Sequence, residues 1–363
     1  MDDTRHMARA LKLAARGMAT AHPNPMVGCV IAKDGQVVGE GWHRRTGEPH
    51  AEIVALEAAG TGARDSTVYV SLEPCSHHGR TPPCADALVE AGVARVVAAM
   101  VDPNPEVSGR GLERLRAAGI EVASGLLEAE ARELNRGFVK RMQTGRPWVQ
   151  LKIAASLDGG TAMQSGESQW ITGPSARADV QRFRAAAGAI MTGVGTVIAD
   201  DPRLTVRDGI DAGRQPLRVV LDSGLRTPLT ARMFREPGAT RIYYCGAPVR
   251  EDLEEAGATL VRVAGHRGGV DPAAVLDDLG TLGVNLVMVE AGATLAGSLA
   301  ADALVDEFVI YQAAQLLGSG TRPMLDTPGW TRLGHRLDLD IIDLRRVGSD
   351  IRIIARAAQQ QET

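Results

Sequence analysis

The sequence contains few aromatic residues and no excess of positive charge. Aromatic side chains make up 3% of the 363 residues, and 40 Lys and Arg face 44 Asp and Glu, for a formal net charge of −4. Proteins that bind nucleic acid usually carry a basic patch for phosphates and aromatic rings on which bases stack. The composition therefore argues against a nucleic-acid partner, including tRNA as a substrate.

Cysteines and long apolar stretches are also scarce. Four cysteines in 363 residues are too few for a disulfide-stabilised fold, so paired cysteines are better explained as metal ligands or core residues. No apolar run approaches the roughly 18 residues needed to cross a membrane. The first residues, MDDTRH, are acidic and lead into an amphipathic pattern rather than the apolar core of a signal peptide. We therefore expect a cytoplasmic protein with no membrane partner.

Short apolar runs alternate with helical patterns along the chain, which indicates an α/β layered fold. A chain of 363 residues fits two domains better than one or three. The stretch Thr144-Gly145-Arg146-Pro147 interrupts a helical pattern, and an apolar strand pattern follows at once. We therefore place the domain boundary here, between residues 1–145 and 146–363.

The apolar periodicity predicts the elements of both domains. In the first, we expect strands at 27–32, 37–41, 68–72, 95–101 and 120–123, and helices at 7–18, 49–59, 82–91, 111–118 and 127–142. The turn Lys33-Asp34-Gly35 predicts a hairpin. In the second, we expect strands at 148–153, 189–192, 217–221, 241–245, near 261, 284–290 and 305–312, and helices at 273–282 and 294–301.

A candidate zinc site lies in the first domain. His50-Ala51-Glu52 is followed by Pro74-Cys75 and then by Cys84. One His and two Cys form a three-ligand set whose open fourth position is typical of catalytic zinc, where water loses a proton near neutral pH. Glu52 is then the catalytic residue that carries protons to the leaving amine. The pattern matches the general signature of zinc deaminases.

The spacing of the cysteines leaves alternatives open. Eight residues separate Cys75 from Cys84, whereas the general signature has two. The site could be a structural one with His77 or His78 as a fourth ligand, or two core cysteines near an unrelated His. Cys29 and Cys245, which occur in apolar strand patterns, are interpreted as buried core residues.

The second domain lacks the glycine pattern of a Rossmann fold. Gly193-Val194-Gly195 follows a strand pattern, but Ile198 occupies the third glycine position. The backbone here and the hydroxyl of Thr196 could still bind a pyrophosphate at a helix start. Gly292-Ala293-Thr294, at a strand-to-helix junction, suits the same role, or else Thr294 is an ordinary helix N-cap.

Longer motifs resemble a known family. These are Pro23–Val30, His50-Ala51-Glu52, Leu72–Cys84, Asp102-Pro103-Asn104-Pro105 with Gly109 and Gly111, Ser156–Gly159, Gly166–Thr172, Gly195–Arg207 and Glu290–Leu295. Together they resemble the bifunctional riboflavin-biosynthesis family RibD, in which the eight-residue insert between the cysteines is typical. The resemblance covers nearly the whole chain.

The resemblance implies two enzyme activities in one chain. A cytidine-deaminase-like three-layer α/β/α domain would use Zn²⁺ to deaminate 2,5-diamino-6-ribosylamino-4(3H)-pyrimidinone 5′-phosphate. An α/β domain like dihydrofolate reductase would then reduce 5-amino-6-(5-phosphoribosylamino)uracil to its ribityl form with NADPH. It also implies a homo-oligomer, most simply a dimer. The alternatives are a zinc deaminase of another substrate, and a non-enzymatic zinc protein, which would have no need of Glu52.

The resemblance also implies roles for individual residues. The zinc ligands are His50, Cys75 and Cys84, Glu52 is the proton shuttle, and Asn24 lines the deaminase pocket. The NADPH contacts are Ala154, Trp170, Thr196, Asp200, Ser223, Gly292, Ala293 and Thr294. The reductase substrate contacts are Ser168, Arg184, Leu204, Arg207 and Glu290, and we add Lys152 to the same polar cluster.

Physical chemistry supports several of these assignments. Arg184 and Arg207 offer fork-shaped donors that suit a sugar phosphate, whereas Arg203 is expected to be a solvated surface charge. Glu290 ends a buried strand, where a carboxylate needs partners, and ribose hydroxyls would supply them. Ser223 and Arg226 are our hypothesis for the group that binds the NADPH 2′-phosphate.

Overall fold

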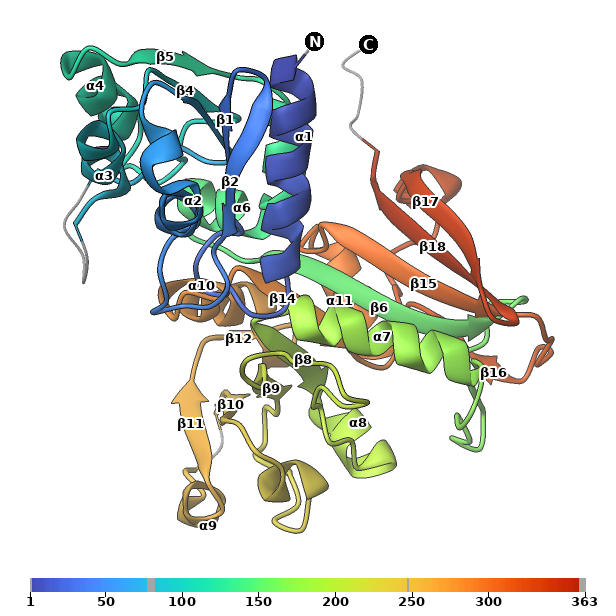
Figure 1. The fold of residues 1–363 in the computed structure, drawn as a ribbon. Helices are drawn as coiled ribbons and strands as arrows, with labels where there is room; N and C mark the ends of the chain where they lie inside the picture. The colour runs from blue at the N-terminus through green and yellow to red at the C-terminus, as the bar shows by residue number, and fades with distance from the viewer. Residues whose placement is uncertain (1, 77–81, 247, 359–363) are drawn as a thin grey trace. The chain divides into compact units, whose positions relative to one another are not determined.

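The computed structural model describes residues 2–76, 82–246 and 248–358 and divides the chain into two compact units (Figure 1). The first is Met1–Arg146 and the second is Pro147–Thr363. None of the helices in the described residues is long and apolar enough to cross a lipid bilayer.

The first unit contains a five-stranded sheet. Its strands are β1 (Gly28–Lys33), β2 (Gln36–Trp42), β3 (Thr67–Val70), β4 (Arg95–Ala98) and β5 (Glu121–Ser124), in the order β2-β1-β3-β4-β5. β1 runs antiparallel to β2 and β3, whereas β3, β4 and β5 are parallel. Asp34 and Gly35 have positive φ, 50° and 76°, as a two-residue hairpin turn requires. The predicted hairpin is confirmed.

Helices cover both faces of this sheet. They are α1 (Asp2–Ala14), α2 (Ala51–Ala59), α3 (Cys84–Ala91), α4 (Arg110–Ala117), α5 (Glu128–Leu134) and α6 (Arg136–Thr144). Ile31 and Val68 face a core formed with α2, α3 and α4, whereas their neighbours Val30 and Tyr69 face a core formed with α1, α5 and α6. This period-two alternation gives the predicted three-layer α/β/α fold.

The single helix predicted for 127–142 is wrong, because the chain forms two helices that meet at Asn135. Asn135 leaves the helical region, with φ −102° and ψ 22°. Its side chain accepts a hydrogen bond from the Met26 N–H (2.8 Å) and donates one to the Met26 carbonyl (2.9 Å). Asparagine competes for backbone hydrogen bonds in this way, and the partner is 109 residues away in sequence.

The second unit contains a nine-stranded sheet. Its strand order is β11-β10-β9-β8-β14-β6-β15-β18-β17. The first seven strands in this order are parallel to one another, whereas β18 runs antiparallel to β15 and β17 runs antiparallel to β18 at the edge of the sheet. The strands are β6 (Trp148–Ser156), β8 (Ala189–Gly193), β9 (Leu217–Leu221), β10 (Thr240–Tyr244), β11 (Ala258–Arg262), β14 (Leu286–Glu290), β15 (Glu307–Ala313), β17 (Leu339–Val347) and β18 (Asp350–Ala357). The two-residue strands β7 (Ala162–Met163) and β16 (Thr321–Arg322) pair with each other, as do β12 (Gly265–His266) and β13 (Gly269–Val270).

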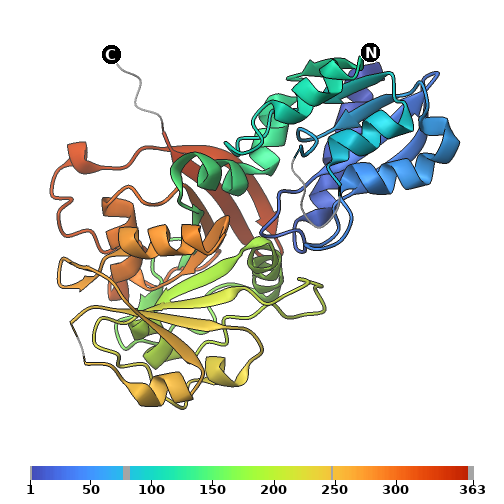
Figure 2. The same cartoon turned by 90° about the vertical axis from the view of Figure 1, so that its left-hand side faces the viewer.

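Helices pack on both faces of this sheet too, and the predicted α/β class is confirmed. They are α7 (Pro174–Ala186), α8 (Val194–Asp200), α9 (Glu251–Glu255), α10 (Pro272–Thr281) and α11 (Ala293–Ala301). α10 and α11, in orange in Figure 2, cover the face that carries Val149 and Leu151, whereas α7 covers the opposite face at Met288 and Tyr311.

The helices α7, α8 and α9 and the strands β17 and β18 were not predicted, nor were the two-residue strands β7, β12, β13 and β16. The buried face of α7 includes Gln181 and Arg184, so the helix has no continuous apolar stripe. β17 exposes apolar residues such as Ile341 and Leu344, and its register shifts between Ile341 and Asp343. The alternation that signals a strand is therefore lost.

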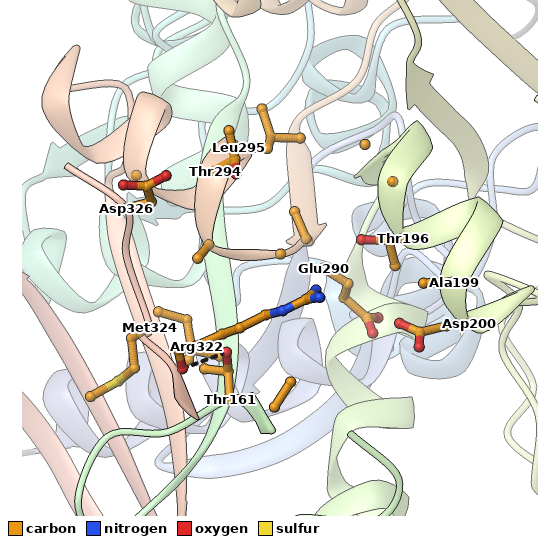
Figure 3. Close-up of a pocket in the computed structure, with 18 of the residues that line it drawn as sticks. Thr161, Thr196, Ala199, Asp200, Glu290, Thr294, Leu295, Arg322, Met324 and Asp326 are labelled. Atoms are coloured by element: carbon orange, nitrogen blue, oxygen red, sulfur yellow. Dashed lines mark hydrogen bonds between the residues drawn. The ribbon is translucent and has the colours of Figure 1, made fainter. Parts of the chain in front are cut away.

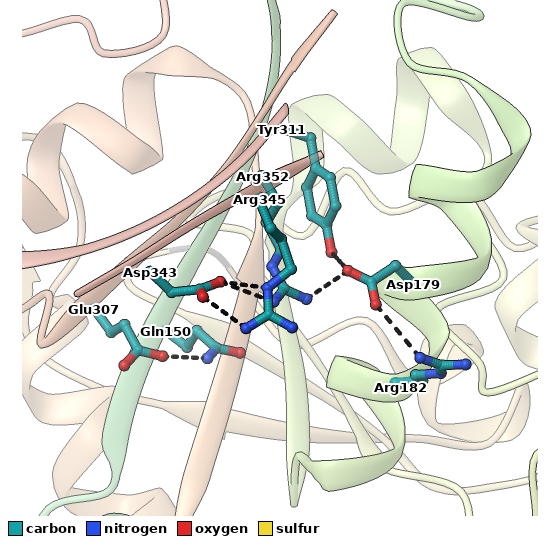
Figure 4. A network of polar contacts seen from close by, with 8 residues as sticks. All are labelled: Gln150, Asp179, Arg182, Glu307, Tyr311, Asp343, Arg345 and Arg352. Carbon is teal, nitrogen blue, oxygen red and sulfur yellow. Dashed lines mark hydrogen bonds and ion pairs between the residues drawn. The ribbon is translucent and has the colours of Figure 1, made fainter. Parts of the chain in front are cut away.

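An ionic network joins the β17–β18 hairpin to α7 (Figure 4). Arg352 in β18 donates to Asp179 in α7 (2.7 Å) and to Asp343 in β17 (3.0 Å), and Asp179 also accepts from the Tyr311 hydroxyl (2.8 Å). The Arg352 side chain is 9% exposed, so its charge depends on these partners. The network fixes the hairpin at the edge of the sheet.

Candidate active sites

His50, Cys75 and Cys84 meet in the first unit. His50 immediately precedes α2, Cys75 lies in the segment after β3, and Cys84 is the first residue of α3. His50 Nδ1 lies 3.3 Å from Cys84 Sγ and 3.6 Å from Cys75 Sγ. Among the described residues this is the only group of His, Cys and acidic side chains close enough to share a metal ion.

The geometry fits zinc. Zn–N and Zn–S bonds of about 2.1 and 2.3 Å in a tetrahedron separate a nitrogen ligand from a sulfur ligand by about 3.6 Å, close to the distances observed. Hydrogen bonds from Cys84 and His50 lower the pKa of Cys75 to about 4 against the effect of burial, whereas the Cys75 sulfur and burial raise the pKa of Cys84. A divalent cation bound to both sulfurs would displace the thiol proton of Cys84.

Glu52 is buried beside this cluster. It lies in the first turn of α2 and is 3% exposed. Burial raises the pKa of Glu52 to about 7, and the charge of His50 opposes this effect. A carboxyl group that titrates near neutral pH can both accept and release a proton. Cys29 lies in the core, as predicted, and His77 and His78 lie outside the described residues.

Asn24 is held by a histidine that the sequence analysis did not single out. His43 Nδ1 lies 3.2 Å from the Pro49 carbonyl, and His43 Nε2 lies 3.0 Å from Asn24 Nδ2. Because a carbonyl only accepts, Nδ1 carries the proton, and Nε2 accepts from the Asn24 amide. This directs the Asn24 carbonyl oxygen away from His43. The only sequence signal for His43 was its place seven residues before His50.

The second unit contains a cavity of about 1480 Å³ beside the carboxyl ends of its parallel strands. Ligands of open α/β sheets bind at this edge. All the residues predicted for the reductase line it: Lys152, Ala154, Ser168, Trp170, Arg184, Thr196, Asp200, Leu204, Arg207, Ser223, Glu290, Gly292, Ala293 and Thr294. They come from segments spread over more than 140 residues, and only the fold brings them together.

Glu290 and Arg184 form a bidentate ion pair at the cavity wall. The distances are 2.6 Å from Arg184 Nε to Glu290 Oε1 and 2.9 Å from Nη2 to Oε2, and the side chains are 11% and 13% exposed. Arg184 Nη1 also donates to the Thr205 carbonyl (2.9 Å). This leaves Arg184 two of its five N–H groups for a ligand. Arg184 supplies a partner for the buried Glu290 carboxylate, whose remaining lone pairs can still accept hydrogen bonds from ribose hydroxyls, as expected from the sequence.

Charged groups gather around this pair. Lys152 is the β6 neighbour of Glu290 in the sheet register. Burial lowers the pKa of Lys152, while the charges of Glu290 and Asp200 oppose this effect. Glu290 and Asp200 point toward each other across the cavity (Figure 3), and the Ser168 hydroxyl donates to Asp200 (3.4 Å). The cluster carries both acceptors and donors for a polyhydroxy ligand.

Gly292 is the N-cap residue of α11, and no side chain caps this helix. The alternative that Thr294 is an N-cap is therefore wrong. A Cβ atom on Gly292 would lie 4.0 Å from Thr196 Oγ1, so the two predicted phosphate-binding segments face each other. The helix N–H groups between them are suited to an anion.

Several lining residues were missed or differ from expectation. Arg322, from β16, projects into the cavity beside Thr161 (Figure 3), and no signal could have identified a two-residue strand. Arg203 also lines the cavity and pairs with Glu236 (3.1 Å), and its side chain is 44% exposed, as expected of a solvated charge. Ser223 accepts a hydrogen bond from the Val270 N–H (3.0 Å).

Comparisons with known proteins agree with the division into two domains. The family model described as the cytidine and deoxycytidylate deaminase zinc-binding region matches residues 1–100, and the RibD C-terminal domain matches residues 147–353. The chain is 52% identical to the riboflavin biosynthesis protein RibD of Escherichia coli over 97% of this chain and 98% of that protein. It is 46% identical to RibD of Haemophilus influenzae, over 96% and 95%.

Solved structures give the same result. RibD of Acinetobacter baumannii superposes with a TM-score of 0.93 at 45% identity, over 99% of both chains. A Thermotoga maritima protein described as a diaminohydroxyphosphoribosylaminopyrimidine deaminase/5-amino-6-(5-phosphoribosylamino)uracil reductase superposes with a TM-score of 0.87 at 32% identity, over 98% and 99%.

The folds and sites define a two-part enzyme in which a zinc deaminase is joined to a reductase. Its cofactors are Zn²⁺ and NADPH. The chain belongs to the RibD family of bifunctional riboflavin-biosynthesis proteins.

Proposed function

We propose that residues 1–145 deaminate 2,5-diamino-6-ribosylamino-4(3H)-pyrimidinone 5′-phosphate, and that residues 146–363 reduce the product, 5-amino-6-(5-phosphoribosylamino)uracil, to its ribityl form. The observation that carries the proposal is the pair of sites in one chain. One joins a His-Cys-Cys cluster to the buried Glu52, and the other gathers all the predicted reductase residues around one cavity. The Thermotoga maritima relative is named for the same two activities.

In the deaminase, His50, Cys75 and Cys84 would hold the zinc ion. When bound, zinc acts as a Lewis acid and lowers the pKa of water. Glu52 accepts a proton from the attacking water as its oxygen bonds to the ring carbon, and it delivers this proton to the departing amine, so that the C–N bond breaks, ammonia leaves and a carbonyl remains. Asn24, oriented by His43, holds the edge of the pyrimidine with its carbonyl oxygen.

In the reductase, NADPH supplies the hydride. The cofactor contacts are Ala154, Trp170, Thr196, Asp200, Ser223 and Gly292–Thr294, with Arg226 at the 2′-phosphate. The substrate contacts are Ser168, Lys152, Leu204, Arg207, Glu290 and the two remaining donors of Arg184. Arg207 and these donors bind the 5′-phosphate, since two guanidinium groups suit a dianion. Lys152 and Glu290 contact the ribosyl hydroxyls.

The direct test supplies the diaminopyrimidine substrate and measures ammonia release and NADPH oxidation separately. We expect both, with ammonia release first. Arg207→Ala should impair reduction and spare deamination, because the two sites lie in different units. Equal loss of both activities would contradict this division, and a chain that releases ammonia only from other pyrimidines would contradict the substrate.

We propose that the protein is a cytoplasmic homodimer, and the exposed edge of the second unit supports the dimer. Ile341 and Leu344 of β17 are each 60% exposed, and an uncovered apolar edge strand promotes association unless a partner covers it. Since the ionic network fixes the hairpin, the surface is already formed. Ile341→Glu with Leu344→Glu should give a monomer by light scattering. Val37→Glu, on an exposed apolar position of the first unit, is the control, and a wild-type monomer would contradict the proposal.

A further inference from the structure

Glu73 lies two residues before Cys75 and is 3% exposed, yet the chemistry above gives it no part. Its carboxylate is surrounded by backbone donors rather than by a cation. Oε2 accepts from Asp102 N–H (3.0 Å) and Gly109 N–H (2.9 Å), and Oε1 from Gly111 N–H (2.8 Å) and Leu112 N–H (3.4 Å). A buried charge with four such bonds is fully solvated by the protein.

These bonds make Glu73 the cap of helix α4. Gly111 and Leu112 are the second and third residues of α4, whose N–H groups an N-cap side chain normally binds. The N-cap residue itself is Gly109, which has no side chain to do so. A carboxylate is also favoured at the positive end of a helix. The segment that leads to Cys75 is therefore attached to the start of α4.

The backbone of α4 lies directly against the same segment. A Cβ atom on Gly111 would lie only 2.0 Å from the Pro74 carbonyl oxygen, so no larger residue fits without moving one of the two. Gly109 has a φ of 87°, which favours glycine. This explains why Gly109 and Gly111 accompany the Asp102–Pro105 motif in the sequence.

One turn further along, Arg114 connects α4 to both cysteine segments. Its Nη1 donates to the Ser76 carbonyl (3.4 Å), directly after Cys75. Its Nε forms an ion pair with Asp86 in α3, two residues after Cys84. The start of α3 is itself bound to Cys75, because Cys84 N–H donates to Cys75 Sγ (3.2 Å) and Ala85 N–H donates to its carbonyl (3.2 Å).

We propose that Glu73 and Arg114 are positioning residues for the zinc site. Through them α4 holds the Cys75 segment at a fixed distance from α3, so that the two sulfurs are arranged before the metal binds. This inference rests on the proposed ligand set His50, Cys75 and Cys84. Pre-arranged ligands lose less conformational entropy on binding, and residues that orient metal ligands are typically worth about 10–100-fold in metal affinity.

The test measures zinc affinity of the full chain by competition with a chelator. We expect Glu73→Gln to weaken zinc binding by about tenfold or more, because the amide NH₂ would face backbone donors. Glu113→Gln, an exposed change on the same helix, is the matched control. The Co²⁺-loaded variant should show a shifted ligand-field spectrum, and added zinc should restore ammonia release, whereas NADPH-dependent reduction should not change.

Wild-type zinc affinity and an unchanged Co²⁺ spectrum in folded Glu73→Gln would overturn the proposal. If circular dichroism shows that this variant does not fold, the partly exposed Arg114→Gln decides, with Arg116→Gln as its control. Zinc binding that is weaker in Arg114→Gln than in Arg116→Gln supports the proposal, and equal zinc affinity in these two variants overturns it. A wild-type chain that binds no zinc would instead contradict the ligand set itself.

Discussion

The Asn24 amide donates to His43 Nε2 across 3.0 Å, because the Pro49 carbonyl holds the proton of His43 on Nδ1. The orientation of the Asn24 amide is thus set by a residue 19 positions away. The carbonyl oxygen of Asn24 is left to accept a hydrogen bond. The diaminopyrimidine offers N–H groups as donors, whereas a pyrimidine edge that carried only carbonyl groups would offer none.

We therefore expect His43→Ala to raise the KM of deamination by about fivefold, because one hydrogen bond is worth about 1 kcal/mol. Zinc content should not change, since His43 is not a ligand. The measurement is ammonia release against substrate concentration. In an Asn24→Ala background the His43 substitution should have little further effect, and two independent, additive losses would show that His43 does not act through Asn24.

Glu52→Gln should keep zinc but lose deamination by about 10²–10⁴-fold, because the amide cannot carry a proton from water to the amine. Reduction of the deaminated substrate by the same preparation is the internal control. Zinc analysis and ammonia release of the purified variant test this. Ammonia release at the wild-type rate would remove Glu52 from the mechanism.

Glu290→Gln should destabilise the second unit by about 3–5 kcal/mol, since it leaves the guanidinium of Arg184 buried without its counter-ion. Denaturant unfolding followed by tryptophan fluorescence measures the effect. Asp338→Asn is the matched control, because it breaks an ion pair with Arg336 whose side chains are 56% and 64% exposed. A loss no larger than that of the control would show that the buried pair adds little.

The same pair predicts how stability depends on pH. Burial alone would raise the pKa of Glu290, but the charge and hydrogen bonds of Arg184 lower it from 4.5 to about 2. A carboxylate with a lowered pKa stabilises the fold above its unfolded pKa, and a difference of this size corresponds to about 3 kcal/mol. That contribution should disappear as the pH falls from about 4.5 to about 2. Across this range the free energy of unfolding should change less with pH in Glu290→Gln than in the wild type. The same pH dependence in both proteins would contradict the assignment.

If Arg226 binds the 2′-phosphate, Arg226→Ala should weaken the binding of NADPH and leave the binding of NADH unchanged. A lost charged hydrogen bond is worth about 1.5–3 kcal/mol, so the ratio of kcat/KM for NADPH over NADH should fall by roughly 10–100-fold. Arg232, which lines the same cavity but pairs with Asp201, supplies the control Arg232→Ala. An unchanged ratio in Arg226→Ala would remove the residue from cofactor selection.

The sequence by itself determined the chemistry and most of the local structure. The residue types and order of His50, Glu52, Cys75 and Cys84 specify a metal ligand set with an acid beside it. The Asp34-Gly35 turn and the strongly periodic strands form where they were predicted, because turn geometry and apolar alternation are properties of neighbouring residues.

Only the tertiary structure decided which distant polar groups became partners. Arg184 and Glu290 are 106 residues apart, and Glu73 caps a helix that begins 37 residues later. No local pattern contains such pairs, because a buried charge takes whichever donors the packed elements bring to it. For the same reason the sequence suggested an unbroken helix through Asn135, whereas packing gave the Asn135 side chain the Met26 backbone as its partner.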